Sequence, residues 1–415
     1  MRCSKFQVVL AIAAVAIAAL VFTTAPANAA DLYSSGAKPW NTTTANWGVS
    51  GGPYNTATWN NATPDNAIFE GSSGTVALGE AISVKDITFD TTNSNYNISG
   101  NTLNFATGGS ITSAATNERH TITSAIAGSP TVNIAFNGNK DYGPAGGSYG
   151  NAIYEGLHFA PTSGSQTLGT INTAAGTTGD KSGVFLEGTT TGNSVAEITY
   201  ILGHYGSLVK RGTGTWTVGN VTLGTVRIGD GTLVVNGTIT TKYQGFKFAD
   251  PGGTLAGNVT INSNYSSIPL LGGCSIAPGT SIGTITIAGN DELVWDSDDT
   301  TAGMVFDLSD TDSTSDLLDV SGAFTKGTGT DFLFDFIGGK GGETYTLVNF
   351  GSTDFSLGDF AVGSGMEGTF AFGQSNLQYT TAAGGAVIPE PSTFLIWGLG
   401  LLGLLLYARR RRSGS

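Results

Sequence analysis

The sequence predicts an all-β fold whose body is a solenoid of short, stacked strands. Glycine and threonine are abundant, with 62 Gly and 57 Thr among 415 residues. Both are poor helix formers, whereas Thr suits a pleated surface and Gly suits tight turns. Short runs of alternating apolar and polar residues recur about every ten residues, as strands and their turns do. Clear examples lie at residues 75–78, 82–89, 102–105, 215–218, 225–228, 232–235 and 284–287.

This spacing is compatible with two architectures, the hairpins of a β-sandwich and the rungs of a solenoid. Gly-rich punctuation that recurs without helical insertions favours the solenoid. The low content of charged residues, 12%, also favours it, because stacked rungs bring like charges close together. A net charge of −13 argues against a nucleic-acid partner, since an acidic chain repels phosphate.

The N-terminal residues 1–29 have the pattern of a secretory signal peptide. Arg2 and Lys5 precede an apolar run at residues 8–22, and Ala27 and Ala29 occupy the −3 and −1 positions that signal peptidase requires. The alternative is a transmembrane anchor, which the shortness of the apolar run disfavours. We therefore expect an exported protein that is cleaved after Ala29.

The C-terminal residues 387–415 carry a second address. Pro389, Glu390 and Pro391 precede an apolar segment at residues 394–408. As a helix, fifteen residues rise only about 22 Å, less than the ~30 Å of a hydrocarbon core. A basic cluster follows, made of Arg409, Arg410, Arg411 and Arg412. The positive-inside rule would keep this cluster cytoplasmic, so the exported body would be held in the inner membrane by a single helix.

This tripartite tail resembles the PEP-CTERM sorting signal of Gram-negative bacteria. The resemblance implies that an exosortase cuts near Pro389–Pro391 and that the product moves to the cell surface or the exopolysaccharide matrix. A plain C-terminal anchor is the alternative. The segments before Ala30 and after Tyr407 hold six of the 18 basic residues, so their loss would leave a net charge of −19. Cys274 would then be the last cysteine, so no intramolecular disulfide is expected.

The middle of the chain is similar to an autotransporter-associated β-strand repeat. Residues 208–218 match its opening and residues 229–237 its closing part, although the stretch between them is shorter than usual. The segments 253–260 and 275–287 resemble what commonly follows. Trp40, Trp47, Trp59 and residues 64–69 resemble the cap that precedes such repeats. The resemblance implies a right-handed parallel β-helix in a secreted protein. In place of the translocator barrel of an autotransporter this chain has the PEP tail, and we therefore expect no such barrel.

These observations predict five regions. They are a signal peptide (1–29), an N-terminal β-rich cap and solenoid region (30–205), the repeat region (206–290), a C-terminal β region with an acidic stretch (291–386) and the sorting signal (387–415).

The acidic stretch is the one candidate for a metal site. Asp310, Asp312 and Asp316 have the spacing that begins an EF-hand, and clustered carboxylates suit Ca²⁺. Ser315 and Ser321 stand where that loop has Gly and Glu, however, so a solvated acidic loop is the default interpretation. We otherwise expect no metal and no cofactor.

Signals for catalysis are weak. His120, His158 and His204 lack metal-ligand spacing, and we expect them at the surface or in turns. Glu118 or Asp180 with Glu187 can be nominated as paired carboxylates, but nothing in their spacing singles them out. Exposed tryptophans can stack on sugars; here Trp40, Trp47 and Trp59 are interpreted as cap residues and Trp216 as core.

The sequence thus favours a non-enzymatic, secreted surface or matrix protein with a structural or adhesive role. Its expected partners are signal peptidase, exosortase and exopolysaccharide. The alternative is a polysaccharide-binding or polysaccharide-degrading protein on the same scaffold.

Overall fold

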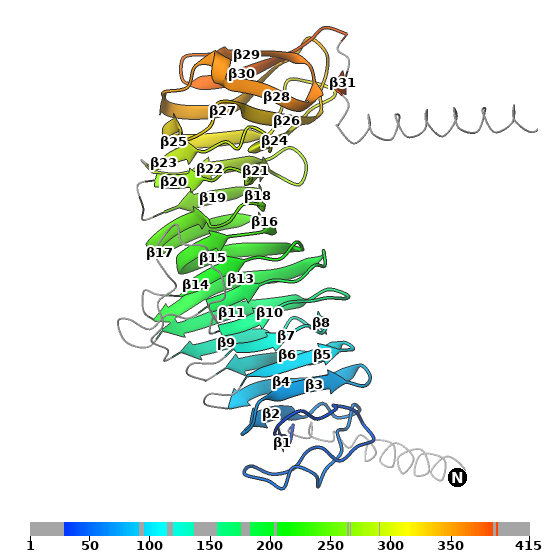
Figure 1. Ribbon diagram of the computed structural model, residues 1–415. Coiled ribbons are helices and arrows are strands. Elements are labelled where there is room, and N and C mark those ends of the chain that lie inside the picture. The colour runs from blue at the N-terminus through cyan, green and yellow to red at the C-terminus, as the bar shows by residue number, and fades with distance from the viewer. Residues whose placement is uncertain are drawn as a thin grey trace, which may run out of the picture.

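The chain forms one tall stack of β-strands (Figure 1). The computed structural model describes residues 29–90, 95–113, 119–136, 156–175, 183–202, 206–263, 265, 267–289, 291–384 and 387–388. Within these residues no helix has the length and hydropathy needed to cross a membrane. The predicted apolar segment at 394–408 and the predicted signal peptide up to residue 28 lie outside the described residues. The all-β prediction is confirmed.

The first part of the stack contains short strands separated by turns. They are β1 (Asp31–Ser34), β2 (Asn66–Glu70), β3 (Gly74–Leu78), β4 (Ile82–Asp90), β5 (Tyr96–Gly100), β6 (Leu103–Ser113), β7 (Arg119–Ile122), β8 (Ile126–Ala127), β9 (Thr131–Phe136), β10 (Gly156–Phe159), β11 (Thr167–Ala175), β12 (Gly183–Leu186), β13 (Asn193–Leu202), β14 (Ser207–Lys210) and β15 (Thr215–Ile228).

The second part continues in the same manner and ends in a cap. It comprises β16 (Gly231–Val235), β17 (Gly237–Phe248), β18 (Gly253–Gly257), β19 (Val259–Asn262), β20 (Ser267–Leu270), β21 (Ser275–Pro278), β22 (Thr284–Ile287), β23 (Glu292–Trp295), β24 (Met304–Leu308), β25 (Leu317–Lys326), β26 (Phe332–Gly338), β27 (Thr344–Thr353), the 3₁₀ helix η1 (Leu357–Asp359), β28 (Phe360–Met366), β29 (Gly368–Phe372), β30 (Asn376–Thr381) and β31 (Val387–Ile388).

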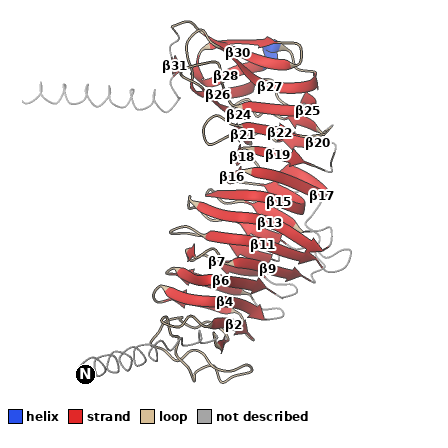
Figure 2. Ribbon diagram, turned by 180° about the vertical axis from the view of Figure 1, so that it is seen from behind, coloured by secondary structure: helices blue, strands red, loops and turns tan. Residues whose placement is uncertain are grey.

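Strands from successive turns of the chain pair in parallel. Figure 2 shows that the strands lie across the long axis of the stack. One turn passes from β16 through β17 to β18, and Gly231 lies beside Gly253, a step of 22 residues. Parallel pairing between turns argues against the hairpins of a sandwich, and it is consistent with a β-helix. The ladders also cross both predicted internal boundaries, since β12 pairs with β14 and β22 pairs with β25. The division into regions stays a prediction.

Apolar side chains from each turn stack on those of the next and form one continuous core. In one column, successive paired strands contribute Ile198, Val221, Ile239, Ile261 and Ile287, all 0–1% exposed. Alternate residues point outward, so β22 has the burial pattern that its alternating sequence predicts. Burial of these columns supplies the main stabilising term of the fold.

Both ends of the core are covered. At the N-terminal end, Trp40, Trp47 and Trp59 pack with ring centroids 4.8–5.0 Å apart, and each is at most 2% exposed. Their predicted role as cap residues is confirmed. At the C-terminal end, β30 pairs antiparallel with both β27 and β29 and so ends the parallel ladder (Figure 1).

Candidate functional site

A cluster of charged side chains lies on the face built from β7, β10, β12 and β14. Glu187 follows β12, and its Oε2 lies 3.1 Å from Nδ1 of His158 on β10. Its Oε1 accepts a hydrogen bond from Arg211 Nε at 2.6 Å and forms an ion pair with Arg211 Nη2 at 2.5 Å. Arg119 on β7 approaches Oε2 at 4.0 Å. We call these four residues the Glu187 cluster.

Aromatic packing holds the Glu187 cluster in place. The His158 ring stacks on Phe185 at 4.0 Å with an interplanar angle of 1°, and both side chains are fully buried. The Arg211 guanidinium covers Phe185, 5.3 Å from the ring centre. Burial alone would raise the pKa of Glu187, but the hydrogen bond and charge of His158, followed by those of Arg211, lower it to about 2. Glu187 therefore stays ionised at neutral pH, which suits a structural ion pair and not a proton donor.

The expectation that the histidines lie at the surface or in turns is wrong for the two that the structure describes, which lie on β7 and β10. His120 and His158 are both 0% exposed. His120 stacks on Phe89 at 4.2 Å, and its Nδ1 accepts a hydrogen bond from the Tyr96 N–H at 3.2 Å. An imidazole can be buried when a ring covers its face and its nitrogens have partners. His204, Glu118 and Asp180 lie outside the described residues.

The Glu187 cluster cannot be recognised from the spacing of its residues in the sequence, because its members lie on successive turns of the stack. His158 and Phe185 are direct neighbours across the β10–β12 ladder, although 27 positions separate them in the sequence. The missing signal is the ladder register, in which residues one turn apart stack. Once that register is known, Arg119, His158 and Glu187 fall on one face.

The three Ca²⁺ candidates have separate hydrogen-bond partners. Asp310 Oδ1 accepts from the Gly339 N–H at 2.8 Å, and Asp312 Oδ1 accepts from the Thr314 N–H at 3.0 Å. Asp316 is 1% exposed, and its two oxygens accept from the N–H groups of Gly283 (2.7 Å) and Asp307 (2.8 Å). No group of three His, Cys, Asp or Glu among the described residues is placed to hold a metal ion.

The acidic stretch differs from the predicted solvated loop. β23 and β24 run through it, and Asp316 joins the turn before β22 to a backbone N–H of β24. Burial raises the pKa of Asp316 to about 7, against the opposing effect of the two N–H groups. This carboxylate acts as a backbone acceptor that ties two turns together.

The lysine of the repeat-like opening has a similar structural role. Lys210 ends β14, and its Nζ donates to the carbonyl oxygens of Gly212 (2.6 Å), Asp230 (2.8 Å) and Arg211 (3.2 Å). Burial lowers its pKa to about 8. The ammonium group thus closes the turn after β14 and binds it to the turn before β16.

Replacement of Lys210 by methionine is expected to lower the free energy of unfolding by about 1–2 kcal/mol, because buried carbonyls lose a shared donor. Urea denaturation of the full chain measures the change. Lys85→Met is the matched control, since Lys85 Nζ contacts one exposed carbonyl, that of Thr107. Equal effects of the two substitutions would contradict the role given to Lys210.

The five tryptophans that the structure describes offer no exposed platform for a sugar. Trp216 on β15 is 0% exposed, and its Nε1–H donates to the Glu187 carbonyl oxygen at 2.8 Å. Its predicted place in the core is confirmed. Trp295, a further buried indole, packs on Phe332 with ring centroids 5.1 Å apart.

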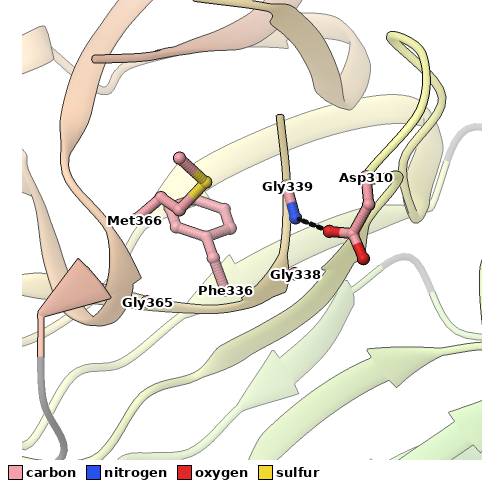
Figure 3. Close-up of a pocket in the computed structure, with 6 residues that line it drawn as sticks. All are labelled: Asp310, Phe336, Gly338, Gly339, Gly365 and Met366. Carbon is pink, nitrogen blue, oxygen red and sulfur yellow. Dashed lines mark hydrogen bonds between the residues drawn. The ribbon is translucent and has the colours of Figure 1, made fainter. Parts of the chain in front are cut away.

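The described chain ends against the C-terminal cap. β31 pairs antiparallel with β28, so that Val387 lies beside Met366 and Ile388 beside Gly365. A cavity of about 200 Å³ opens at this point; Figure 3 shows Phe336 and Met366 on one side and Asp310 on the other. The predicted motif residues Pro389, Glu390 and Pro391 follow directly, outside the described residues, as do Arg409–Arg412 and, at the other end, Ala27.

Comparison with known proteins identifies this tail. A family model for the PEP-CTERM protein-sorting motif matches residues 387–412. Over 125 residues the chain is 41% identical to the adhesin BmaC autotransporter of Brucella suis biovar 1 (strain 1330). This match covers 29% of the chain but only 4% of the adhesin. The chain thus carries a PEP-CTERM sorting motif and is similar, over part of its length, to an autotransporter adhesin; together these support a secreted surface protein.

Proposed function

We propose that this protein is a non-enzymatic, structural or adhesive component of the cell surface or exopolysaccharide matrix, delivered there by exosortase. The observation that carries the proposal is the sorting motif at residues 387–412, placed directly after the cap of a parallel β-stack. A long stack with both ends covered suits a display or adhesive role, because its outer face is extended and its core is closed.

The remaining steps of delivery belong to the same proposal. Signal peptidase cleaves after Ala29, residues 394–408 form a transient inner-membrane helix, and the arginines at 409–412 stay cytoplasmic. The body winds as a right-handed β-helix, the hand that parallel crossovers take in about 98% of cases. The part similar to the adhesin supports an adhesive use of this surface.

Substitution of Pro389 and Glu390 by alanine is expected to retain the protein in the membrane fraction with its tail intact. Wild-type protein should appear at the surface or in the matrix as a shorter product. Fractionation of the producing cells, followed by intact-mass measurement, distinguishes the two forms. Ser392→Ala, next to the motif, serves as the control and should be released normally. Release of the Pro389→Ala/Glu390→Ala variant at wild-type size would refute the sorting proposal.

A further inference from the structure

The C-terminal cap ends in a strand whose outer edge is open. β29 pairs antiparallel with β30, and no other strand of the described residues pairs with it. β30 in turn pairs with β27, and Figure 1 shows β29 and β30 at the top of the stack. The outer edge of such a strand presents a row of backbone donors and acceptors to which another strand can add.

The opposite end of the stack shows how such an edge is closed. On the outer side of β1, the Tyr33 N–H donates to the Gly48 carbonyl oxygen at 3.1 Å, and the Gly48 N–H donates to the Tyr33 carbonyl oxygen at 3.0 Å. Edge strands are otherwise protected by a charged residue, a proline or a bulge. The sequence of β29, Gly-Thr-Phe-Ala-Phe, contains no charge and no proline, and its register with β30 runs without a shift. None of these devices blocks the addition of a strand to β29.

The hydrogen bonds around β29 identify the backbone groups on its open edge. Just after the strand, the Gly373 N–H donates to the Asn376 carbonyl oxygen at 2.9 Å, on the side of β30. In an antiparallel ladder the residues that bond to one neighbour recur at every second position. The N–H and C=O groups of Gly368, Phe370 and Phe372 therefore point away from β30, toward the open edge.

Apolar side chains accompany this edge. Phe370 and Phe372 pack against the core, with ring centroids 5.3 Å from Phe334 and 6.1 Å from Phe350, yet both remain partly exposed. Leu357 of η1, which lies beside β29, is 44% exposed. A strand added along β29 would cover apolar surface as well as complete the backbone pairing.

We propose that β29 is a self-association edge, at which β29 of a second copy of this chain pairs antiparallel about a two-fold axis at Phe370. The two Phe370 residues exchange hydrogen bonds, and Gly368 exchanges them with Phe372 of the other copy. This register sets the large Phe372 ring opposite a residue without a side chain, and Thr369 opposite Ala371. A two-fold interface must be complementary to itself, and this alternation of large and small residues is. Because β29 carries no charge, charge does not select a foreign strand over this one.

The pairing joins two stacks cap to cap. Since β27, β30 and β29 follow one another toward the end of the stack, the same sheet continues into the second copy. The assembly is twice as long as one chain and displays two adhesive surfaces, which raises avidity. Residues 291–386 hold 16 acidic and two basic residues, so the two caps repel each other and salt should strengthen their association. The inference goes beyond the proposed delivery and does not depend on it.

The oligomeric state of the protein purified from the producing cells tests this proposal. The protein is taken from the medium if it is released and from the membrane in detergent if it is retained, so the result is independent of sorting. In sedimentation velocity the wild type should form dimers at micromolar concentration, with a dissociation constant that falls as salt is raised. Thr369→Glu/Ala371→Glu changes two exposed side chains of the edge strand and should raise this constant at least tenfold.

The matched control places the same two charges one strand away from the edge. Gln378 and Thr380 on β30 are the ladder partners of Ala371 and Thr369 and are partly exposed. Gln378→Glu/Thr380→Glu should change the dissociation constant less than threefold. A wild type that stays monomeric, leaving its edge to a strand of another protein, would overturn the proposal. A dimer that Thr369→Glu/Ala371→Glu does not weaken would overturn it too.

Cysteine cross-linking tests the register. Thr369 and Ala371 of the two copies form a non-hydrogen-bonded pair, whose Cα atoms lie about 4.5 Å apart, within disulfide range. A mixture of Thr369→Cys protein with Ala371→Cys protein should therefore give disulfide-linked dimers on oxidation. Either variant alone should cross-link at least tenfold more slowly, because its two thiols are diagonal neighbours at about 7–8 Å. Cys274 does not compete, since its side chain is buried. Equal cross-linking by one variant alone would contradict the pairing about Phe370.

Discussion

Replacement of Trp47 by alanine is expected to destabilise the N-terminal turns of the stack by about 3–5 kcal/mol. Trp47 is 1% exposed and lies at the centre of the cap, with ring centroids 5.0 Å from Trp40, 4.9 Å from Trp59 and 5.6 Å from Phe69. A solenoid needs such a cap because its last turn otherwise exposes the core. Removal of the ring leaves a cavity that the neighbouring indoles cannot fill.

Hydrogen exchange measured along the chain separates this local effect from global unfolding. Faster exchange should be confined to β1, β2 and β3, because each turn contacts only its neighbours. Val49→Ala in the same segment is the control; Val49 is 61% exposed and its truncation should change stability by no more than about 0.5 kcal/mol. A loss spread evenly over the stack, or an equal loss in the control, would contradict the capping role.

The core residues of this fold can be predicted from the sequence, because the apolar residues of each alternating run are the ones that are buried. The run at 284–287 shows the principle: Thr284 and Thr286 face outward while Ile285 and Ile287 are buried. The tryptophan cap could be predicted too, from the resemblance of Trp40, Trp47 and Trp59 to the cap that precedes autotransporter-associated repeats.

The polar contacts between turns could not be predicted in this way, because they depend on the ladder register. Asn258 Oδ1 accepts from the Thr284 N–H, and Asn236 Oδ1 accepts from the Asn258 N–H, each one turn away. Asp316 Oδ1 likewise accepts from the Gly283 N–H one turn away, although the acidic composition of this stretch predicted a solvated loop. Turn lengths set this register. The step is 22 residues at Gly231–Gly253 but 33 at Thr284–Leu317, and nothing in the alternation pattern encodes that change.

Asp316 should make the stability of the protein depend on pH near neutrality. Its pKa is raised from 3.8 to about 7 in the folded chain by burial, so the folded state binds its proton more tightly than the unfolded state. The stabilising contribution is complete below about pH 4 and disappears as pH rises through 7. Each tenfold difference in proton affinity corresponds to about 1.4 kcal/mol, so we expect a decline of about 2–4 kcal/mol between pH 4 and 8.

Comparison with Asp316→Asn isolates this effect from the other carboxylates. The variant should match wild type near pH 4 and exceed its free energy of unfolding by about 2–4 kcal/mol at pH 8, because asparagine carries no charge to desolvate. Glu187, whose pKa is lowered to about 2, titrates in both proteins and cancels in the difference. Asp312→Asn is the exposed control and should give a difference that is constant from pH 5 to 8. A constant difference for Asp316→Asn would show that its carboxylate is ionised throughout this range, and that the two backbone N–H groups outweigh its burial.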